Sequence, residues 1–240
     1  MRLEGIDLMA LDQMVNQDLM SEIEECEVEI ENVVASGMLE QPLDLDLIYK
    51  TIPGSRYNPQ RFPGLYLNLK NPKSFLLIFN SGKIISMGTR SVRQARRSIM
   101  TAIKELKSTG IVILKEPKIE IENMVACADL KERVDLEDSA MTLERTIYEP
   151  ENFPGLIHIM KEPKVTLLLF TSGKMVCAGA KSEEQIFQAV IKIKATLKEK
   201  GLIKPKIIEF KKQAWPGRQD AVTDYNVLKR PLPCIAATPT

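Results

Sequence analysis

The chain has 240 residues, 44% of them hydrophobic, and a formal net charge of +1. This length and composition allow a sizeable core and exclude a chain that is disordered throughout. No apolar run approaches the roughly 20 residues that a membrane-spanning helix needs, and the acidic start lacks the basic and apolar regions of a secretory signal. Four scattered cysteines without CxxC spacing and a single histidine predict neither a zinc site nor a disulfide framework. We therefore expect a soluble intracellular protein.

Charge is distributed unevenly along the chain. Residues 1–31 contain ten acidic side chains and one basic one, which gives −9, whereas the remaining residues contain 22 acidic and 32 basic ones, which gives +10. A basic body favours a polyanionic partner. The acidic N-terminal segment is then either a solvated tail or an internal competitor for the surface that binds this partner. Apolar residues within 7–24 have intervals that fit an acidic amphipathic helix.

The elements that follow have clear boundaries. Alternation and turn residues predict, in chain order, a strand at 30–36, a short helix at 44–51, a Tyr-Asn-Pro turn at 57–59 and strands at 65–69, 74–79 and 83–88. A long helix comes next, because Ser91 and Gln94 have the spacing of a capping box and apolar residues then recur at helical intervals. Gly110 is placed to end this helix.

The second half of the chain repeats the first half. YNPQRFPGLYLNLKNPKSFLLIFNSGK, which starts at Tyr57, recurs as YEPENFPGLIHIMKEPKVTLLLFTSGK from Tyr148. Alignment of residues 30–111 with 121–202 needs no gap, and 30 of the 82 positions are identical. The period is longer than the roughly 20–50 residues of solenoid units, so the sequence predicts a duplicated half-domain. After the second copy, a candidate strand at 206–210 leads into a tail that we expect to be mobile.

Both faces of the predicted sheet are apolar. Because side chains alternate across a strand, Phe75, Leu77 and Phe79 face one side, and Leu76 and Ile78 face the other. Each half offers one long and one short helix, which is enough to cover one face only. The other face, bordered by lysines that recur in both halves, is typical of an interaction surface. An apolar centre with a basic rim suits the minor groove of DNA, which is bordered by phosphates.

The paired FPGL…P-K…LLIF-x-SGK and IEN-x-V blocks resemble those of one family, the TATA-box-binding proteins, over about residues 28–203, and FPGL resembles archaeal members more than nuclear ones. The resemblance implies an α+β fold with internal duplication: a two-fold pseudo-symmetric saddle whose curved antiparallel sheet has helices on its convex face and DNA under its concave face. The implied divisions are an acidic extension (1–27), a first repeat (28–113), a second repeat (114–203) and a C-terminal extension (204–240). No enzymatic activity and no cofactor are implied, and the location would be the archaeal nucleoid, or the nucleus if the source is eukaryotic.

The resemblance also assigns roles to individual residues. Proteins of this family are a standard example of minor-groove kinking by inserted apolar wedges, and the wedge pairs match Phe62 with Phe79 and Phe153 with Phe170. Roles in binding DNA are further implied for central asparagines, for an apolar floor and for phosphate-binding lysines: Asn32 and Asn123; Val34, Leu77, Ile85, Val125, Leu168 and Val176; Lys73, Lys83, Lys164 and Lys174. The alternative is that the four phenylalanines belong to the core.

Partners follow from the same resemblance. The turn before the second FPGL is acidic at Glu149 and Glu151, and in the family this turn docks transcription factor B. The implied partners are double-stranded promoter DNA, transcription factor B and, indirectly, the RNA polymerase assembly, with no membrane. Self-association through the concave face is a further expectation when DNA is absent. The two carboxylates could also be ordinary exposed turn residues.

The chain departs from the family pattern at four positions. Met87 and Ala178 stand where the family usually has Thr or Ser before a glycine, so two central hydrogen bonds should be missing. Asn68 and Ile159 stand where the family often has a basic or polar residue, and Ile159 removes a phosphate contact from the second half. We expect binding that keeps bending and apolar contact but discriminates between sequences less sharply.

Two other functions are compatible with parts of the sequence. Saddle-like halves also occur in some DNA glycosylases and ribonuclease H relatives, but His158 has no nucleophile or carboxylate cluster to act with. A regulatory paralogue, whose saddle binds protein partners or DNA with weak specificity, would fit Met87 and Ala178. In either DNA-binding case, the acidic segment 1–27 could lie on the concave face as a DNA mimic.

Overall fold

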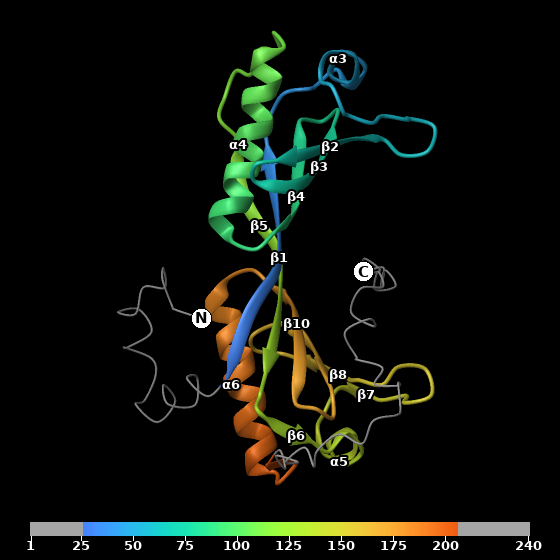
Figure 1. The fold of residues 1–240 in the computed structure, drawn as a ribbon, viewed down its shortest axis with the longest axis vertical. Helices are drawn as coiled ribbons and strands as arrows, with labels where there is room; N and C mark the ends of the chain where they lie inside the picture. The colour runs from blue at the N-terminus through green and yellow to red at the C-terminus, as the bar shows by residue number, and fades with distance from the viewer. Residues whose placement is uncertain (1–25, 206–240) are drawn as a thin grey trace, which may run out of the picture. The chain divides into compact units, whose positions relative to one another are not determined.

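The computed structural model describes residues 26–205. These residues form an antiparallel sheet of nine strands in the order β2-β3-β4-β1-β5-β10-β9-β8-β7, together with a small sheet of β6 and β11. The long helices α4 and α6 lie on one side of the nine-stranded sheet (Figure 1). No helix among residues 26–205 is long and apolar enough to cross a membrane. The predicted acidic helix at 7–24 and the candidate strand at 206–210 lie outside the described residues.

All elements of the first half have counterparts in the second, which has three further short strands, β6, β7 and β11. The first half comprises β1 (Glu27–Met38), α3 (Leu45–Thr51), β2 (Gly64–Lys70), β3 (Lys73–Phe79), β4 (Lys83–Thr89) and α4 (Val92–Ser108). The second comprises β5 (Lys118–Asp129), β6 (Glu132–Val134), α5 (Leu136–Thr142), β7 (Thr146–Ile147), β8 (Leu156–Met160), β9 (Val165–Leu169), β10 (Lys174–Ala180), α6 (Glu183–Glu199) and β11 (Ile203–Pro205). The strands and helices predicted between residues 30 and 111 are all present.

The two halves are joined by the pairing of β1 with β5. These strands are antiparallel over their whole length, from Glu27 opposite Asp129 to Met38 opposite Lys118. On the far sides, β1 pairs with β4 and β5 pairs with β10. One continuous sheet therefore carries both halves, and side chains near its centre come from both.

The long helices begin and end where the sequence predicts. The hydroxyl of Ser91 accepts a hydrogen bond from the backbone N–H of Gln94, and Ser182 caps α6 in the same way through Gln185. Each helix ends before a glycine with positive φ, +89° at Gly110 and +67° at Gly201. The helix positions are therefore set by local sequence signals in both halves.

One face of the sheet packs against these helices. Its side chains are buried together with the inner faces of α4 and α6, and they include Leu76, Ile78, Ile84, Leu167 and Met175. We call the opposite face of the nine-stranded sheet the open face. Among the described residues no helix covers it (Figure 1), which agrees with the prediction that the helices suffice for one face only.

Candidate nucleic-acid interface

Every predicted DNA-binding residue has the strand register of the open face or lies in the turn beside it. In β3, Phe75, Leu77 and Phe79 are partly exposed and alternate with buried residues, and β9 shows the same alternation. Cross-strand neighbours share a face, and the register places Leu77 opposite Ile85 and Leu168 opposite Val176. The predicted apolar floor is thus contiguous within each half. Val176 is its most buried member, at 7% exposed.

The two predicted wedge pairs have the same geometry. The ring centroids of Phe62 and Phe79 are 5.9 Å apart with planes at 63°, and those of Phe153 and Phe170 are also 5.9 Å apart at 63°. This is an edge-to-face arrangement, which is favourable for aromatic rings. None of the four rings belongs to the buried core, and all are partly exposed. The alternative that they are core phenylalanines is therefore wrong.

A glycine beneath each ring pair makes this arrangement possible. A Cβ atom on Gly64 would lie 2.6 Å from Cε1 of Phe62 and 3.1 Å from Cε1 of Phe79. On Gly155 it would lie 2.7 Å from Phe153 and 3.0 Å from Phe170 at the same ring atoms. The sequence marks FPGL as a repeated motif, but this role of its glycine depends on where the two rings lie in space and was not predicted.

The central asparagines are held in one orientation. Oδ1 of Asn32 accepts a hydrogen bond from the backbone N–H of Gly88 at 2.8 Å, and Oδ1 of Asn123 accepts one from Gly179 at 2.9 Å. Because a backbone N–H can only donate, the amide oxygen must face it. Within residues 26–205 no hydrogen bond uses Nδ2 of either asparagine. Each side chain therefore keeps its donor group for another acceptor.

The four predicted phosphate-binding lysines have open-face register at strand ends. Lys83 pairs across the sheet with Met38, and Lys73 with Lys70; Lys174 starts β10, and Lys164 precedes β9. Lys73, Lys164 and Lys174 are exposed, and Lys83 is partly exposed. Cations thus stand at corresponding places in the two halves.

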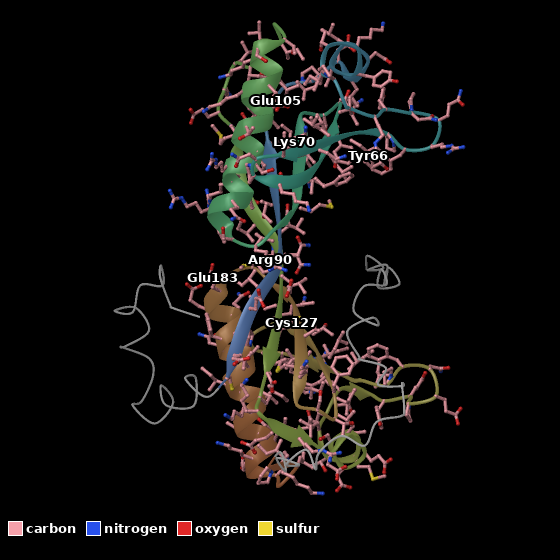
Figure 2. The ribbon with its side chains drawn as sticks, in the orientation of Figure 1. Tyr66, Lys70, Arg90, Glu105, Cys127 and Glu183 are labelled. Carbon is pink, nitrogen blue, oxygen red and sulfur yellow. The ribbon has the colours of Figure 1, made fainter. Side chains whose placement is uncertain are left out.

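Carboxylates also have open-face register, which the sequence analysis did not predict. Glu29 lies opposite Cys127, and Glu120 lies opposite Ser36. Each carboxylate has a cationic partner: Arg90 binds Glu29 at 3.2 Å and Glu31 at 2.8 Å, and Lys118 binds Glu120 at 2.6 Å. Arg90 lies where the two halves meet (Figure 2). The border of the open face is therefore mixed in charge, with cations that offset its acidic side chains.

The four departures from the family pattern also lie on this face. In the first half Met87 is opposite Phe75. The corresponding pair in the second half is Ala178 opposite Thr166. Asn68 lies opposite Phe75 from the other side, and Ile159 lies opposite Thr166. The departures thus lie at corresponding places in the two halves: Asn68 and Met87 are on either side of Phe75, and Ile159 and Ala178 are on either side of Thr166.

The two turns before the FPGL motifs have similar backbones but different charges. The N–H of Phe62 donates to the carbonyl of Asn58, and that of Phe153 donates to the carbonyl of Glu149. Glu149 and Glu151 are exposed, and one carboxylate oxygen of Glu149 accepts a hydrogen bond from the side chain of Asn152. The acidic pair is therefore accessible to a partner.

Enzymatic chemistry has no support among residues 26–205. His158 lies on β8, where burial lowers its pKa, and the Nδ1 atom is buried without a hydrogen-bond partner in this part of the chain. Burial raises the thiol pKa of Cys177 to about 12, so this cysteine is a poor nucleophile. The described residues contain no cluster of His, Cys, Asp or Glu that could hold a metal ion.

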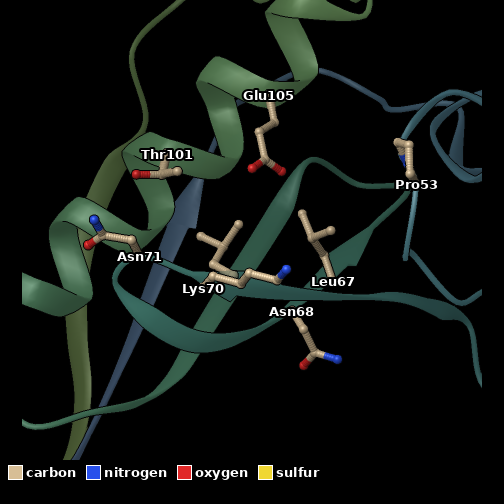
Figure 3. A pocket seen from close by; sticks show the side chains of 8 residues that line it. Pro53, Leu67, Asn68, Lys70, Asn71, Thr101 and Glu105 are labelled. Carbon is tan, nitrogen blue, oxygen red and sulfur yellow. The ribbon is translucent and has the colours of Figure 1, made fainter.

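A shallow depression lies away from the wedges, at the edge between β2 and α4 (Figure 3). It has a volume of about 300 Å³ and is lined by Lys70, Thr101 and Glu105 among others. Burial raises the pKa of the Glu105 carboxyl. Lys70 thus borders this edge, unlike the four lysines assigned to phosphates.

Comparison with known proteins identifies the family. The model of the family described as transcription factor TFIID, or TATA-binding protein (TBP), matches residues 27–109 and 118–200. This chain belongs to that family. The TATA-box-binding protein of Pyrodictium occultum is 50% identical over 176 residues, covering 73% of this chain and 88% of the relative. That of Pyrococcus furiosus is 42% identical over 184 residues, covering 77% and 96%.

A solved structure supports the same assignment. The TBP of Methanococcus jannaschii matches with a TM-score of 0.68 and 45% identity, covering 72% of this chain and 99% of that chain. The predicted fold class, a curved antiparallel sheet of two TBP repeats with helices on one face, is confirmed. The TBP family consists of DNA-binding transcription factors rather than enzymes, so the enzymatic alternative is rejected.

Proposed function

We propose that this protein binds promoter DNA at a TATA box through the minor groove and bends it. In this proposal the pair Phe62–Phe79 and the pair Phe153–Phe170 insert at base steps near the two ends of the site. The apolar floor between them lies against the sugars and base edges. Unstacking costs a few kcal/mol per step and is offset by the longer contact that a bent groove allows.

The observation that carries this proposal is the pair of identical ring arrangements on the uncovered face. Exposed aromatic pairs are costly on a free surface, because their apolar area remains in water. Two pairs at corresponding ends of one sheet fit a duplex that is kinked twice. A single wedge would fit a protein that bends DNA once.

The asparagines supply the proposed base contacts. The minor-groove edge of A·T pairs presents only acceptors, N3 of adenine and O2 of thymine, so a reader must offer donors. The Nδ2 groups of Asn32 and Asn123 meet this requirement, because their Oδ1 atoms already accept from Gly88 and Gly179. Met87 and Ala178 add no hydroxyl beside them, so discrimination rests on these two amides and on apolar contact.

Lys73, Lys83, Lys164 and Lys174 are proposed to bind phosphates, which fixes the position of the duplex without reading its sequence. Glu149 and Glu151 are proposed to dock transcription factor B, which in turn connects the complex to RNA polymerase. Their exposure and the different charge of the other turn support this polarity. Without DNA, the apolar open face is available for self-association.

A bending measurement tests the proposal. A TATA duplex with a donor and an acceptor dye at its ends should show increased energy transfer when the protein binds. Phe79→Ala and Phe170→Ala should each weaken binding and reduce the transfer. Lys104→Ala, an exposed change on α4, is the matched control and should change neither. Equal behaviour of all three variants would contradict the proposal.

A second candidate is a regulatory TBP paralogue that binds protein partners or DNA with weak sequence specificity. Met87 and Ala178 favour it, because they remove polar groups from the centre of the open face. A paralogue of this kind would bind TATA and G·C-substituted duplexes with similar Kd. Failure of transcription factor B to join the DNA complex would also favour it, as would a complex with factor B that Glu149→Lys/Glu151→Lys leaves unchanged.

A further inference from the structure

We propose that the two repeats differ in base-pair tolerance: the second repeat accepts a G·C pair at the place where the first repeat requires A·T. This inference rests on the proposed function, because it assumes that the open face lies in a minor groove. It concerns one cross-strand pair in each repeat. Phe75 lies opposite Met87 in the first, and Thr166 lies opposite Ala178 in the second.

These two pairs occupy equivalent places but present different surfaces. All four side chains are partly exposed on the open face, and the inner member of each pair adjoins the glycine that holds a central asparagine. Phe and Met reach far from the backbone, whereas Thr and Ala are short. The first repeat therefore presents a raised apolar surface beside Asn32, and the second presents a lower one beside Asn123.

Further aromatic contacts restrict the raised surface of the first repeat. The Tyr66 ring lies 5.6 Å from that of Phe75 and 5.2 Å from that of Phe62, so the three rings form a row with Phe79 at its end. Tyr66 is labelled in Figure 2. In the second repeat, Ile157 stands at the position of Tyr66. Among the described residues of that repeat, no aromatic contact extends beyond the wedge pair. Packing thus limits how far Phe75 can move aside for a ligand.

The groove chemistry turns this difference into specificity. In the minor groove, a G·C pair differs from A·T by the exocyclic amino group of guanine, which projects into the groove as a donor. An apolar ring pressed against that group would bury it without a partner, which is unfavourable. Over Thr166 and Ala178 there is more space, and Thr166 Oγ1 can accept the hydrogen bond. Within residues 26–205 that hydroxyl has no other partner.

A self-complementary A·T duplex tests this inference without knowledge of the binding orientation. A G·C pair is placed at each position of one half in turn, and then at the symmetry-related position as well. With one substitution, the protein can orient its second repeat over the altered half, so the loss should be less than about threefold at the sensitive position. With both, the first repeat must cover a G·C pair, and the loss should reach the roughly 5- to 150-fold typical of an unfavourable base pair.

The chain provides its own matched variants. Phe75→Thr/Met87→Ala gives the first repeat the residues of the second, so the doubly substituted duplex should also be tolerated. Thr166→Phe/Ala178→Met does the reverse, and a single G·C pair should then cost at least about fivefold. All positions are on the open face, and melting curves check that the variants fold.

The outcomes are distinct. Losses that simply multiply between the single and double substitution in the unaltered protein, or exchanges that leave the pattern unchanged, would overturn the inference while leaving the proposed function intact. Failure to bind and bend the parent A·T duplex would overturn the proposed function, and this inference with it.

Discussion

Adding one methyl group under a wedge should damage DNA bending more than folding. In Gly64→Ala the new Cβ atom would lie 2.6 Å from Cε1 of Phe62, and in Gly155→Ala it would lie 2.7 Å from the same atom of Phe153. Carbon atoms pack at about 3.5–4.0 Å, so each ring must move by roughly 1 Å. At Gly64 the atoms to be displaced belong to the free ends of partly exposed rings, so the rings can yield without a backbone shift. At Gly155 the carbonyl oxygen of Leu169 would also lie 3.2 Å from the new Cβ, so the backbone there must adjust slightly as well.

The cost should appear in binding. Displacement of the ring moves the wedge away from the base step it would enter, whose unstacking costs a few kcal/mol that close contact must offset. We expect a loss of about 1–2 kcal/mol in DNA affinity, or roughly 5- to 30-fold in Kd, together with a smaller bend. The weakened edge-to-face contact also belongs to the free protein and is worth about 0.5–1.5 kcal/mol, so its melting temperature should fall by only a few degrees.

Energy transfer between dyes at the duplex ends, measured at saturating protein, reports the bend separately from affinity. Gly110→Ala is the control: Gly110 has φ +89° at the end of α4, where a side chain is strained but has open space around it. This variant should melt at a lower temperature and bend DNA normally. Normal binding and bending by Gly64→Ala and Gly155→Ala would refute the assignment of these rings as wedges.

Three further predictions concern charge, thiols and the N-terminal segment. Lys83→Ala and Lys174→Ala should each reduce the slope of log K against log salt concentration by about 0.9, as expected for the loss of one phosphate contact, while Lys104→Ala should leave it unchanged. In a Cys26→Ser/Cys234→Ser background at pH 8, Cys177 should resist alkylation, because burial raises its pKa to about 12. Burial also raises the pKa of Cys127, which should react slowly in the free protein and stop reacting when DNA covers the open face. Mass spectrometry gives both rates, and continued reaction of Cys127 in the complex would place the DNA elsewhere. Deletion of residues 1–25, which contain seven acidic side chains and one basic one, should tighten DNA binding at low salt if this segment competes for the open face, and an unchanged Kd would exclude that competition.

The pH dependence of folding follows from the same thiol. The pKa of Cys177 is raised in the folded state, so its contribution to stability is complete below the ordinary thiol pKa and is lost as the pH rises toward 12. Unfolding at neutral pH and at the pH 8 of the alkylation experiment is therefore insensitive to this group.

Much of the candidate interface could be predicted because strand alternation and internal repetition are local signals. The alternation of Phe75, Leu77 and Phe79 with buried neighbours required only the two-residue period of a strand. The caps at Ser91 and Ser182 required only short-range spacing. Such signals survive in a single sequence, because each depends on residues that are close along the chain.

The carboxylates of the open face could not be predicted in this way. The face on which Glu29 and Glu31 lie depends on irregular register in β1, where the pairing with β5 shifts between Ile30 and Asn32. A bulge of this kind changes the alternation, and nothing in the letters VEIEN (28–32) marks it. The lysines that recur in both halves therefore suggested a basic border, whereas the carboxylates make it mixed, and Arg90 pairs with two of them.

The orientation of the asparagine amides was also beyond the sequence, because it is set by Gly88 and Gly179 from a different strand. Both glycines have positive φ, at +85° and +100°. A residue with a side chain is strained in this conformation, so glycine lets the N–H point toward Oδ1. The residue before each glycine takes no part in this hydrogen bond, and it is Met87 in one repeat and Ala178 in the other.

In the proposed complex, divergence between the repeats separates bending from base reading. The predicted wedge pairs have the same spacing and angle in both repeats, and each lies over a glycine. The pairs Phe75–Met87 and Thr166–Ala178 lie nearer the centre, where in that complex a change of side chain would alter contact with base edges and leave the wedges in place. Exchange of these pairs between repeats should consequently shift the tolerated base pairs without altering energy transfer on the parent duplex. A changed bend would mean that the wedges and the central surface act as one unit.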